Sequence, residues 1–389
     1  MATPIPPSSA GSPNQNGAKE PAYLAQTRAW NPSAIPDLKS VALQAALPRL
    51  LSHPNIAAKR RISVLADEPG PTVERGGDAG VVRARLDGTD RLIALSAGGN
   101  GRFCYLNPRR GAQIAVVECL RRMACTGAVP FAISSRLNLA NPVSPEESYM
   151  LSECLAGLAD VSQFFGLPEL GGGIAFHAQK TSGTGDLTPT VSVVGQIEQE
   201  KHFTRQAVRA AGEKIILLGA APTELGGSQY LGIVHGLNTG DAPQCDLTGA
   251  QKLHNALRGL IKTGAVRGAN ALSEGGLLCC VAEMLFAPDH SFGATLELAT
   301  LQGNRLDALL FGESQNRALV IVSAERMGSV LAESHLRGVS AAVIGEVAAG
   351  SQLTVRGATE DAVSWEIAEL RQGWENSLAN KVNLPVIPA

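Results

Sequence analysis

The sequence predicts a mixed α/β or α+β protein made of two successive domains. The first observation is a helix-to-strand unit, since residues 111–126 carry apolar side chains at helical spacing and residues 131–139 alternate like a strand. The second is that strand and helix patterns alternate again over residues 215–347. The third is size, because 389 residues with 44% hydrophobic side chains suffice for two ordinary cores.

The composition excludes several classes of protein. A formal net charge of -2 gives no long-range attraction to nucleic acid or to an anionic membrane. No run of about 18 apolar residues predicts a transmembrane helix, and the N-terminal residues lack the pattern of a secretory signal. The seven cysteines are odd in number and lie mostly in apolar segments without a zinc-type spacing. We therefore expect buried thiols in a cytoplasmic protein.

Composition and spacing divide the chain into five parts. Residues 1–36 are rich in Pro, Ser, Gly and Asn and should form a disordered tail. Residues 37–54 show helical apolar spacing interrupted by Pro48, which predicts a linker helix. The expected remainder is a first domain over 55–198, a second domain over 210–350 and a helical C-terminal tail over 351–389 with Trp365 and Trp374.

Within each domain the elements follow from periodicity and turn residues. Two short apolar strands surround Asp87-Gly88, which is a hairpin signal. The remaining expected elements of the first domain are the helix-to-strand unit, a helix over 145–165, a turn at Gly171 to Gly173 and a strand over 189–197. Those of the second are strands over 215–219, 318–323 and 343–347 and helices over 252–263, 277–286 and 326–336.

Three polar or flexible positions of the first domain have two readings each. Gly171 to Gly173 could let the backbone approach a phosphate or could form a plain turn. Asp78 could bind a metal or cap a turn. Glu118 could be a magnesium ligand or form a surface ion pair with Arg122, four residues further along the helix. No GxxxxGK[ST] string occurs, which excludes a P-loop.

The string LFGESQNR, which begins at Leu310, places polar side chains just before a predicted strand. Glu313, Ser314, Gln315 and Arg317 could converge to form a site at the strand end, although a capped turn would have the same sequence. The strings ELGGSQYL and ALSEGGLL join paired glycines to a carboxylate and a serine, which suits an anion or a tight helix start equally well.

Taken together, these strings resemble the large component of phosphoribosylformylglycinamidine synthase, the glutamine- and ATP-dependent amidine-forming ligase of purine synthesis. The resemblance covers roughly residues 47–347. The matching strings are PNIAAKRRI from Pro54, GGDAGVV from Gly76, YLNPRRGAQIAVVECLRR from Tyr105, GAVPFAI from Gly127, LNLANP from Leu137, PTVSVVGQIE from Pro189, and then ELGGSQYL, LSEGGLL and LFGESQNR.

The resemblance is to half of that protein. The family's single-chain form resembles two tandem copies of an aminoimidazole ribonucleotide synthetase-like (PurM-like) unit, and this chain is similar to the C-terminal copy. The implied unit has an N-terminal domain whose sheet pairs with that of the other copy into a barrel, and a C-terminal α/β domain. The catalytic histidine and most ATP, magnesium and substrate ligands belong to the N-terminal copy. The resemblance therefore implies no catalytic residue in this chain.

The resemblance also implies where ligands would bind. The C-terminal copy normally lends the shared site an Asp, a Gly, an Asn and a Ser; these positions are Ser135, Gly172, Gly173 and Ala175 here, so only the Gly is kept. Ser135 and Gly172 are the expected nucleotide-binding positions. The expected substrate-binding positions are Glu313, Ser314, Gln315 and Arg317.

A second, pseudo-symmetric site holds a structural nucleotide in relatives. Its metal-binding positions here are Asp78 and Glu118, which keep their carboxylates. Arg122, however, replaces an Asn, and Ala271 replaces an Asp. Magnesium needs several hard oxygen ligands, so we expect this chain to bind it poorly or not at all.

Three functions remain open at this stage. The chain could be the C-terminal half of a split synthase whose partners are a separate N-terminal half and a glutaminase component, with ATP and magnesium as cofactors. It could be a non-catalytic scaffold that forms a homodimer. It could also be an independent ATP-dependent ligase that uses Glu313, Ser314 and Gln315. We expect no nucleic-acid or membrane partner in any of these cases.

Overall fold

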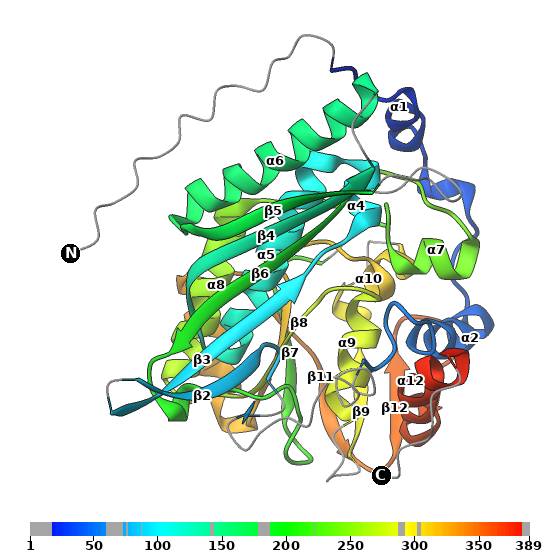
Figure 1. Ribbon diagram of the computed structural model, residues 1–389. Coiled ribbons are helices and arrows are strands. Elements are labelled where there is room, and N and C mark those ends of the chain that lie inside the picture. Colours follow the sequence, from blue (N-terminus) through cyan, green and yellow to red (C-terminus); the bar gives the residue numbers. More distant parts are fainter. Residues whose placement is uncertain are drawn as a thin grey trace.

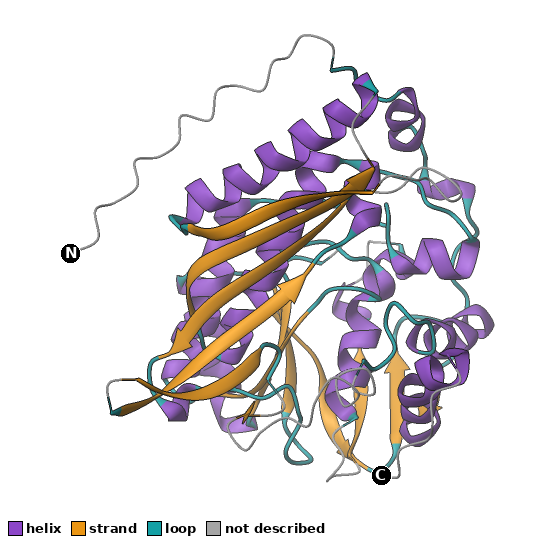
Figure 2. Ribbon diagram, viewed as in Figure 1, coloured by secondary structure: helices purple, strands orange, loops and turns teal. Residues whose placement is uncertain are grey.

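The expected mixed α/β class is confirmed by the computed structural model, which contains two sheets with helices packed around them (Figures 1 and 2). The described residues are 18–59, 73–74, 77–86, 88–140, 144–177, 187–221, 223–286, 292–301 and 305–382.

The first sheet has six strands in the order β1-β2-β3-β6-β4-β5. The expected hairpin is present as β2 and β3, and β4 runs parallel to β5 while the other pairs are antiparallel. One face of the sheet packs against α5, and α6 packs beside α5. The elements are β1 (Val73–Glu74), β2 (Gly80–Leu86), β3 (Thr89–Gly98), α4 (Gly101–Leu106), α5 (Pro108–Thr126), β4 (Val129–Ala140), α6 (Pro145–Phe165), β5 (Glu169–His177) and β6 (Thr188–Ile197).

Helix α5 is the element that both domains share. It begins after Asn107, whose side chain accepts a hydrogen bond from the backbone N–H of Arg110 (3.1 Å), and Pro108 fits the first helical position because it has no N–H to satisfy. It ends at Gly127, whose φ of 88° suits glycine. The helix is almost entirely buried, because one side faces the first sheet and the other faces α8 and β8.

The second sheet has seven strands in the order β13-β12-β9-β11-β7-β10-β8. Alternate residues of β7 enter two different cores, Ile215 and Leu217 on one face and Ile216 and Leu218 on the other. Because both faces of the sheet are buried, strand β7 (KIILL) is a continuous run of apolar residues after its first residue. The elements are β7 (Lys214–Leu218), α7 (Gln229–His235), α8 (Leu247–Lys262), β8 (Val266–Ala271), α9 (Gly276–Leu285), β9 (Phe292–Glu297), α10 (Leu306–Phe311), β10 (Ala318–Val322), α11 (Met327–Leu336), β11 (Ala341–Ala349), β12 (Gln352–Arg356) and β13 (Val363–Glu366).

The helix expected as a linker belongs to a core. Helix α2 (Ser40–Leu51) buries Leu43, Leu47 and Leu50 completely in the cluster that also contains α9 and β13. Pro48 lies inside the helix and does not end it. The apolar stripe that suggested a helix is thus broad enough to serve as one wall of the second domain.

The C-terminal residues form more than a helical tail. Trp365 lies in strand β13, and its indole N–H donates to the carbonyl oxygen of Gln44 (2.9 Å). Trp374 lies in helix α12 (Ile367–Val382) and donates to the carbonyl oxygen of Ile56 (3.1 Å). Both indole N–H groups therefore donate to backbone carbonyl groups within the first 60 residues of the chain. Helices α2 and α12 lie side by side in Figure 1.

Part of the tail expected to be disordered is ordered. Helix α1 (Ala22–Arg28) buries Leu24, and the ring of Tyr23 stacks on Tyr105 of α4 with 4.4 Å between centroids. The carbonyl oxygen of Thr27 accepts a hydrogen bond from the backbone N–H of Gly240 (3.0 Å), in the loop before α8. The segment thus ties the first domain to the second. Residues 1–17, also in the expected tail, lie outside the described residues.

Two expectations from composition can be compared with the fold. All seven cysteines are unpaired, and only Cys245 is not fully buried, in agreement with the expected buried thiols. Within the described ranges, no helix has the length and apolar character needed to span a membrane.

Candidate functional site

The polar centre of the molecule lies where α5 meets two loops of the second domain, 272–275 and 312–317. We call it the polar junction. Its charged members come from α5, from the turn before β2, from helix α9 and from the turns after β8 and α10. The polar junction consists of Asp78, Glu118, Arg121, Arg122, Glu274, Glu283, Glu313 and Gln315.

Arg121 is the hub of the polar junction and is fully buried. Its Nη1 donates to Oε1 of Gln315 (2.9 Å) and its Nη2 to the carbonyl oxygen of Leu272 (2.7 Å). Nη2 also lies 3.5 Å from Oε1 of Glu118. The sequence suggested a surface pair between Glu118 and Arg122; the observed pair is buried and uses Arg121 instead. The helix turns Arg121 toward the second domain and Arg122 toward β3.

Arg122 joins the two sides of the polar junction. Its Nη1 donates to the carbonyl oxygen of Ala97 on β3 and its Nη2 to Oγ of Ser273, both at 3.4 Å. Despite the cost of burial, the carboxylates of Asp78 and Glu118 raise the pKa of Arg122. The two carboxylates thus favour the charged form of this guanidinium.

Asp78 does not cap its own turn but contacts the second domain. Its Oδ2 accepts the backbone N–H of Ala271 (2.8 Å), and its Oδ1 accepts a hydrogen bond from Nε2 of Gln206 (3.3 Å). Burial raises the pKa of Asp78, while Arg122 and the bond from Ala271 act in the opposite direction. Asp78 thus links the two domains.

Glu313 is buried, and only one of its two carboxylate oxygens accepts hydrogen bonds from the described residues. Oε1 accepts the backbone N–H groups of Gln229 (2.6 Å) and Gly275 (2.9 Å), and so joins the starts of α7 and α9. Oε2 has no hydrogen-bond partner among the described residues. Burial raises the pKa of Glu313 to about 8, so the carboxyl group is largely protonated at neutral pH.

Burial also raises the pKa of two further carboxyl groups of the polar junction. Burial raises the pKa of Glu283 to about 7, and the charge of Asp78 adds to this effect. Burial and the charge of Glu118 raise the pKa of Glu274. Burial thus disfavours the ionised form of both carboxyl groups.

The other residues of the LFGESQNR string differ in accessibility. Arg317 is buried, with Nε donating to the carbonyl oxygen of Ser314 (2.9 Å) and Nη2 to that of Gly312 (2.6 Å). Ser314 and Gln315 line a pocket of about 430 Å³ between the end of β7 and the start of α8. Glu313 and Arg317 thus fasten the loop, whereas Ser314 and Gln315 reach a pocket. Substrate binding by these four residues stays a prediction.

The two predicted nucleotide-binding positions are neighbours. Ser135 of β4 and Gly172 of β5 pair directly across the parallel strands. The hydroxyl of Ser135 donates to the carboxylate of Glu169, which also lies against Gly172. The glycine triple is not the expected turn but part of edge strand β5, where the register shifts beside Gly171 (φ 80°). Sequence patterns gave no signal for Glu169.

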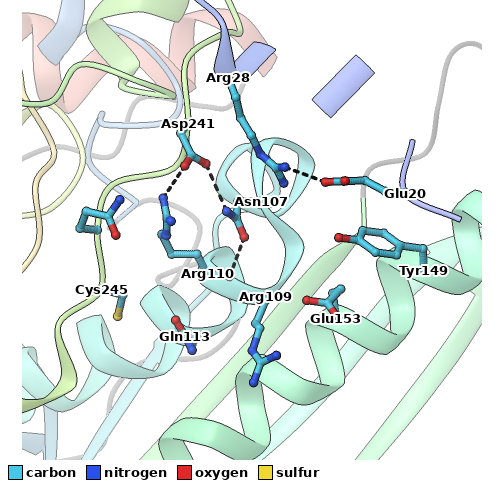
Figure 3. Close-up of a pocket in the computed structure, with 11 residues that line it drawn as sticks. Glu20, Arg28, Asn107, Arg109, Arg110, Gln113, Tyr149, Glu153, Asp241 and Cys245 are labelled. Atoms are coloured by element: carbon cyan, nitrogen blue, oxygen red, sulfur yellow. Dashed lines mark hydrogen bonds and ion pairs between the residues drawn. The ribbon is translucent and has the colours of Figure 1, made fainter. Parts of the chain in front are cut away.

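A groove at the start of α5 was not anticipated from the sequence (Figure 3). Arg110 donates to Oδ2 of Asp241 (2.6 Å), Asn107 donates to Oδ1 of the same carboxylate (3.2 Å), and Arg28 pairs with Glu20 (2.6 Å). The groove measures about 550 Å³ and is lined by Glu20, Arg28, Asn107, Arg109, Arg110, Gln113, Tyr149, Glu153, Asp241, Gln244 and Cys245. Asn107, Arg109 and Arg110, from the string that carries the family resemblance, build one of its walls.

The sequence matches two domain families in succession. Residues 76–197 match the AIR synthase related protein, N-terminal domain, and residues 210–358 match the AIR synthase related protein, C-terminal domain. The chain belongs to the AIR synthase-related family. The resemblance stated from the motifs is confirmed, and the two matched domains correspond to the two sheets.

Curated relatives of the chain add information about length. The chain is 35% identical over 352 residues to phosphoribosylformylglycinamidine synthase subunit PurL of Salinibacter ruber, a match that covers 88% of this chain and 46% of that protein. The chain thus spans about half the length of the curated relatives it matches.

The solved structures with the same fold differ in how much of their own length the match covers. PurL of Thermotoga maritima complexed with ADP has a TM-score of 0.63 at 20% identity over 78% of this chain and 48% of that chain. The protein tt0281 of Thermus thermophilus has a TM-score of 0.54 at 22% identity over 78% of this chain and is covered over 98% of its own length. The fold therefore exists both as half of a longer chain and as a chain of its own.

A magnesium ion does not fit the polar junction as it is built. Both oxygens of Asp78 accept hydrogen bonds from the chain, and Glu118 already contacts Arg121 and Gln315. Within the described ranges, no three His, Cys, Asp or Glu side chains come together as a metal site. Magnesium requires near-octahedral oxygen coordination. No step is therefore assigned to a metal held by Asp78 and Glu118.

Proposed function

We propose that this chain is the C-terminal half of a split phosphoribosylformylglycinamidine synthase and is inactive alone. The observation that carries the proposal is an apolar face on the first sheet. Leu95, Val129 and Phe131 are exposed by 45%, 36% and 46%. In Figure 1 the sheet lies in front of α5 and α8, and no described helix covers the side toward the viewer.

The strand register supports a docking role for this face. Leu95 of β3 pairs with Val194 of β6, and Gln196 of β6 pairs with Val129 of β4, so these side chains share one surface. The opposite face carries the buried residues Leu92, Ala94 and Val193. An apolar surface on a sheet favours pairing with a second sheet. In this proposal the occupant of the face is an N-terminal half of the synthase on a separate chain.

In this proposal the chain contributes a docking surface and the edge of its first sheet, and it contributes no catalytic residue. The partner half would hold ATP and magnesium, which activate the formyl-amide oxygen before ammonia from a glutaminase component displaces phosphate. Gly172 lies on the exposed edge strand β5, and the buried Ser135 pairs with it from the neighbouring strand β4, so backbone groups of β5 can contact a nucleotide held by the partner. We assign the protein to the cytoplasm as part of the same proposal.

A homodimeric scaffold without catalytic function is the second candidate. It is supported by the internal use of Asp78 and Glu118 and by the half-sized neighbour from Thermus thermophilus. A symmetric dimer would cover the same apolar face with a second copy of the chain.

Co-purification with a candidate N-terminal half distinguishes the split synthase from the homodimeric scaffold. Light scattering after size exclusion should show a one-to-one heterodimer in the mixture. A homodimer whose mass does not change when the candidate is added would refute the split synthase and support the scaffold.

A further inference from the structure

Arg136 points out of the open face of the first sheet. It pairs with Thr190 of β6. Four residues further along β6, Val194 pairs with Leu95 of β3. Because side chains alternate between the two faces of a sheet, Arg136 shares the face on which Leu95 is exposed by 45%, whereas the next residue of β4, Leu137, is buried on the opposite side.

Arg91 points out of the same face at its other end. It lies four residues before Leu95 on β3, close to the turn that joins β2 to β3. Arg136 lies beyond the opposite end of β3, because the last pair between β3 and β6 is Gly98 with Val191. Both arginines are exposed. The apolar part of the face around Leu95 thus has a cation toward each end.

The two arginines are unpaired cations in the part of the chain that the structure describes. Neither guanidinium forms a hydrogen bond or an ion pair with a described residue. The other described side chains that β2, β3, β4 and β6 place on this face are uncharged, as in Ile93, Ser134 and Ser192. The face is therefore cationic, although the whole chain carries a formal net charge of -2.

We propose that the open face docks on a partner surface that carries carboxylates opposite Arg91 and Arg136, and that the two arginines disfavour a second copy of this chain as the occupant. The proposal rests on the proposed function, because it specifies the surface chemistry of the N-terminal half that docks at this face.

Charge complementarity is the reason for this choice of partner. A cation that loses water in an interface needs an opposite charge to compensate it. A second copy of the chain brings the same two cations to this face in any relative orientation of the sheets. Like charges across an interface suppress the wrong partner, so a face with carboxylates at these places is preferred.

Charge reversal tests the proposal in the complex with a candidate N-terminal half. Arg136→Glu should weaken this complex roughly tenfold or more at low salt, because an acid would then face the acids of the partner. The affinity of the wild type should fall as salt is added. Arg326→Glu is the matched control, since Arg326 is an exposed residue just before α11 and the change in net charge is the same. Isothermal titration measures all three, and equal affinities for wild type and Arg136→Glu would overturn the proposal.

A second experiment needs no N-terminal half. The double variant Arg91→Glu/Arg136→Glu makes the same face acidic at two exposed positions, so it should fold like the wild type. In analytical ultracentrifugation at low salt, wild type and double variant should each be monomeric, whereas their mixture should form a heterodimer that high salt dissolves.

Two outcomes of this second experiment overturn the proposal. One is a wild-type homodimer that Phe131→Asp dissolves, because a second copy would then occupy the cationic face. The other is a mixture that associates no more than its components, because the charges would then select nothing. Both outcomes count against charge selection and leave the split synthase standing, whereas the split synthase is refuted by a reconstituted mixture that forms no amidine.

Discussion

Ser135 and Gly172 face each other across parallel strands β4 and β5, and the carboxylate of Glu169 accepts the Ser135 hydroxyl beside them. They come from two separate strings of the sequence and meet where the buried Ser135 of β4 adjoins edge strand β5 of the first sheet. A hydroxyl, a carboxylate and a backbone without a side chain are thus combined at the place where the proposed partner would bring a nucleotide.

Gly172 should tolerate a methyl group less well than its neighbour Gly173. A Cβ at Gly172 would lie 2.7 Å from Oε1 of Glu169, whereas a Cβ at Gly173 meets nothing within 4 Å. We expect Gly172→Ala to displace Glu169 and weaken ATP binding by the reconstituted complex roughly tenfold, or about 1.4 kcal/mol. Gly173→Ala should have no effect. Isothermal titration with ATP measures both, and equal affinities for the two variants would argue against a role for this edge.

Phe131 should matter for association but not for folding. Phe131→Asp places a charge among the exposed apolar residues of the sheet and should abolish complex formation, because an unpaired charge would be buried in the interface. The unfolding midpoint of the isolated chain should change little, since Phe131 is half exposed. Leu336→Asp, at a residue of α11 that is 80% exposed, is the control and should leave the complex intact. Light scattering reports the mass of each mixture.

Arg121 should be among the most costly arginines to replace. Arg121→Met leaves Glu118 without its ion pair and Gln315 and Leu272 without a donor, so the free energy of unfolding should fall by about 3–5 kcal/mol. Arg109→Met removes a surface ion pair with Asp160 and should cost less than about 1 kcal/mol. Urea unfolding of both variants checks this, and equal losses would show that the polar junction is not a stabilising hub.

Glu313 should make the protein less stable as the pH rises. Its pKa is raised from the ordinary carboxyl value to about 8 in the folded state. The folded state therefore binds the proton more tightly than the unfolded state, so this contribution is complete below the ordinary pKa and is lost as the pH rises through about 8. Glu283, with a pKa of about 7, acts in the same direction.

Glu313→Gln removes this proton and should flatten the fall in unfolding free energy between about pH 5 and about pH 9. The part of this fall in unfolding free energy that Glu283 causes should remain. Glu360→Gln, at an exposed position, should reproduce the wild-type profile. Parallel profiles for wild type and Glu313→Gln in chemical unfolding would mean that Glu313 titrates normally.

The sequence predicted elements better than it predicted contacts. The apolar stripe over residues 111–126 is a local signal, and it located α5 apart from its first residues, because the helix begins at Pro108 behind the Asn107 cap. Whether Glu118 pairs with Arg121 or Arg122 depends on how α5 is rotated against the second domain, which helical spacing alone does not determine. The burial of α2 likewise depends on a partner surface that lies far away in sequence.

The candidate site shows the same limit. The polar residues of LFGESQNR were recognised, but which of them fasten the loop and which reach a pocket follows from the positions of α7, α8 and α9. Glu169 gave no signal because a single carboxylate before a glycine-rich strand is common on protein surfaces. The strand register that pairs Ser135 with Gly172 is set by the whole sheet.

The most direct test of the account is amidine formation from formylglycinamide ribonucleotide and ammonia, with ATP and magnesium, by this chain mixed with a candidate N-terminal half. The account predicts turnover by the mixture and none by either chain alone, and the Phe131→Asp mixture should be inactive. A mixture that forms a heterodimer but produces no amidine, or a chain that turns over alone, would contradict the claim that this protein is one working half of a split synthase.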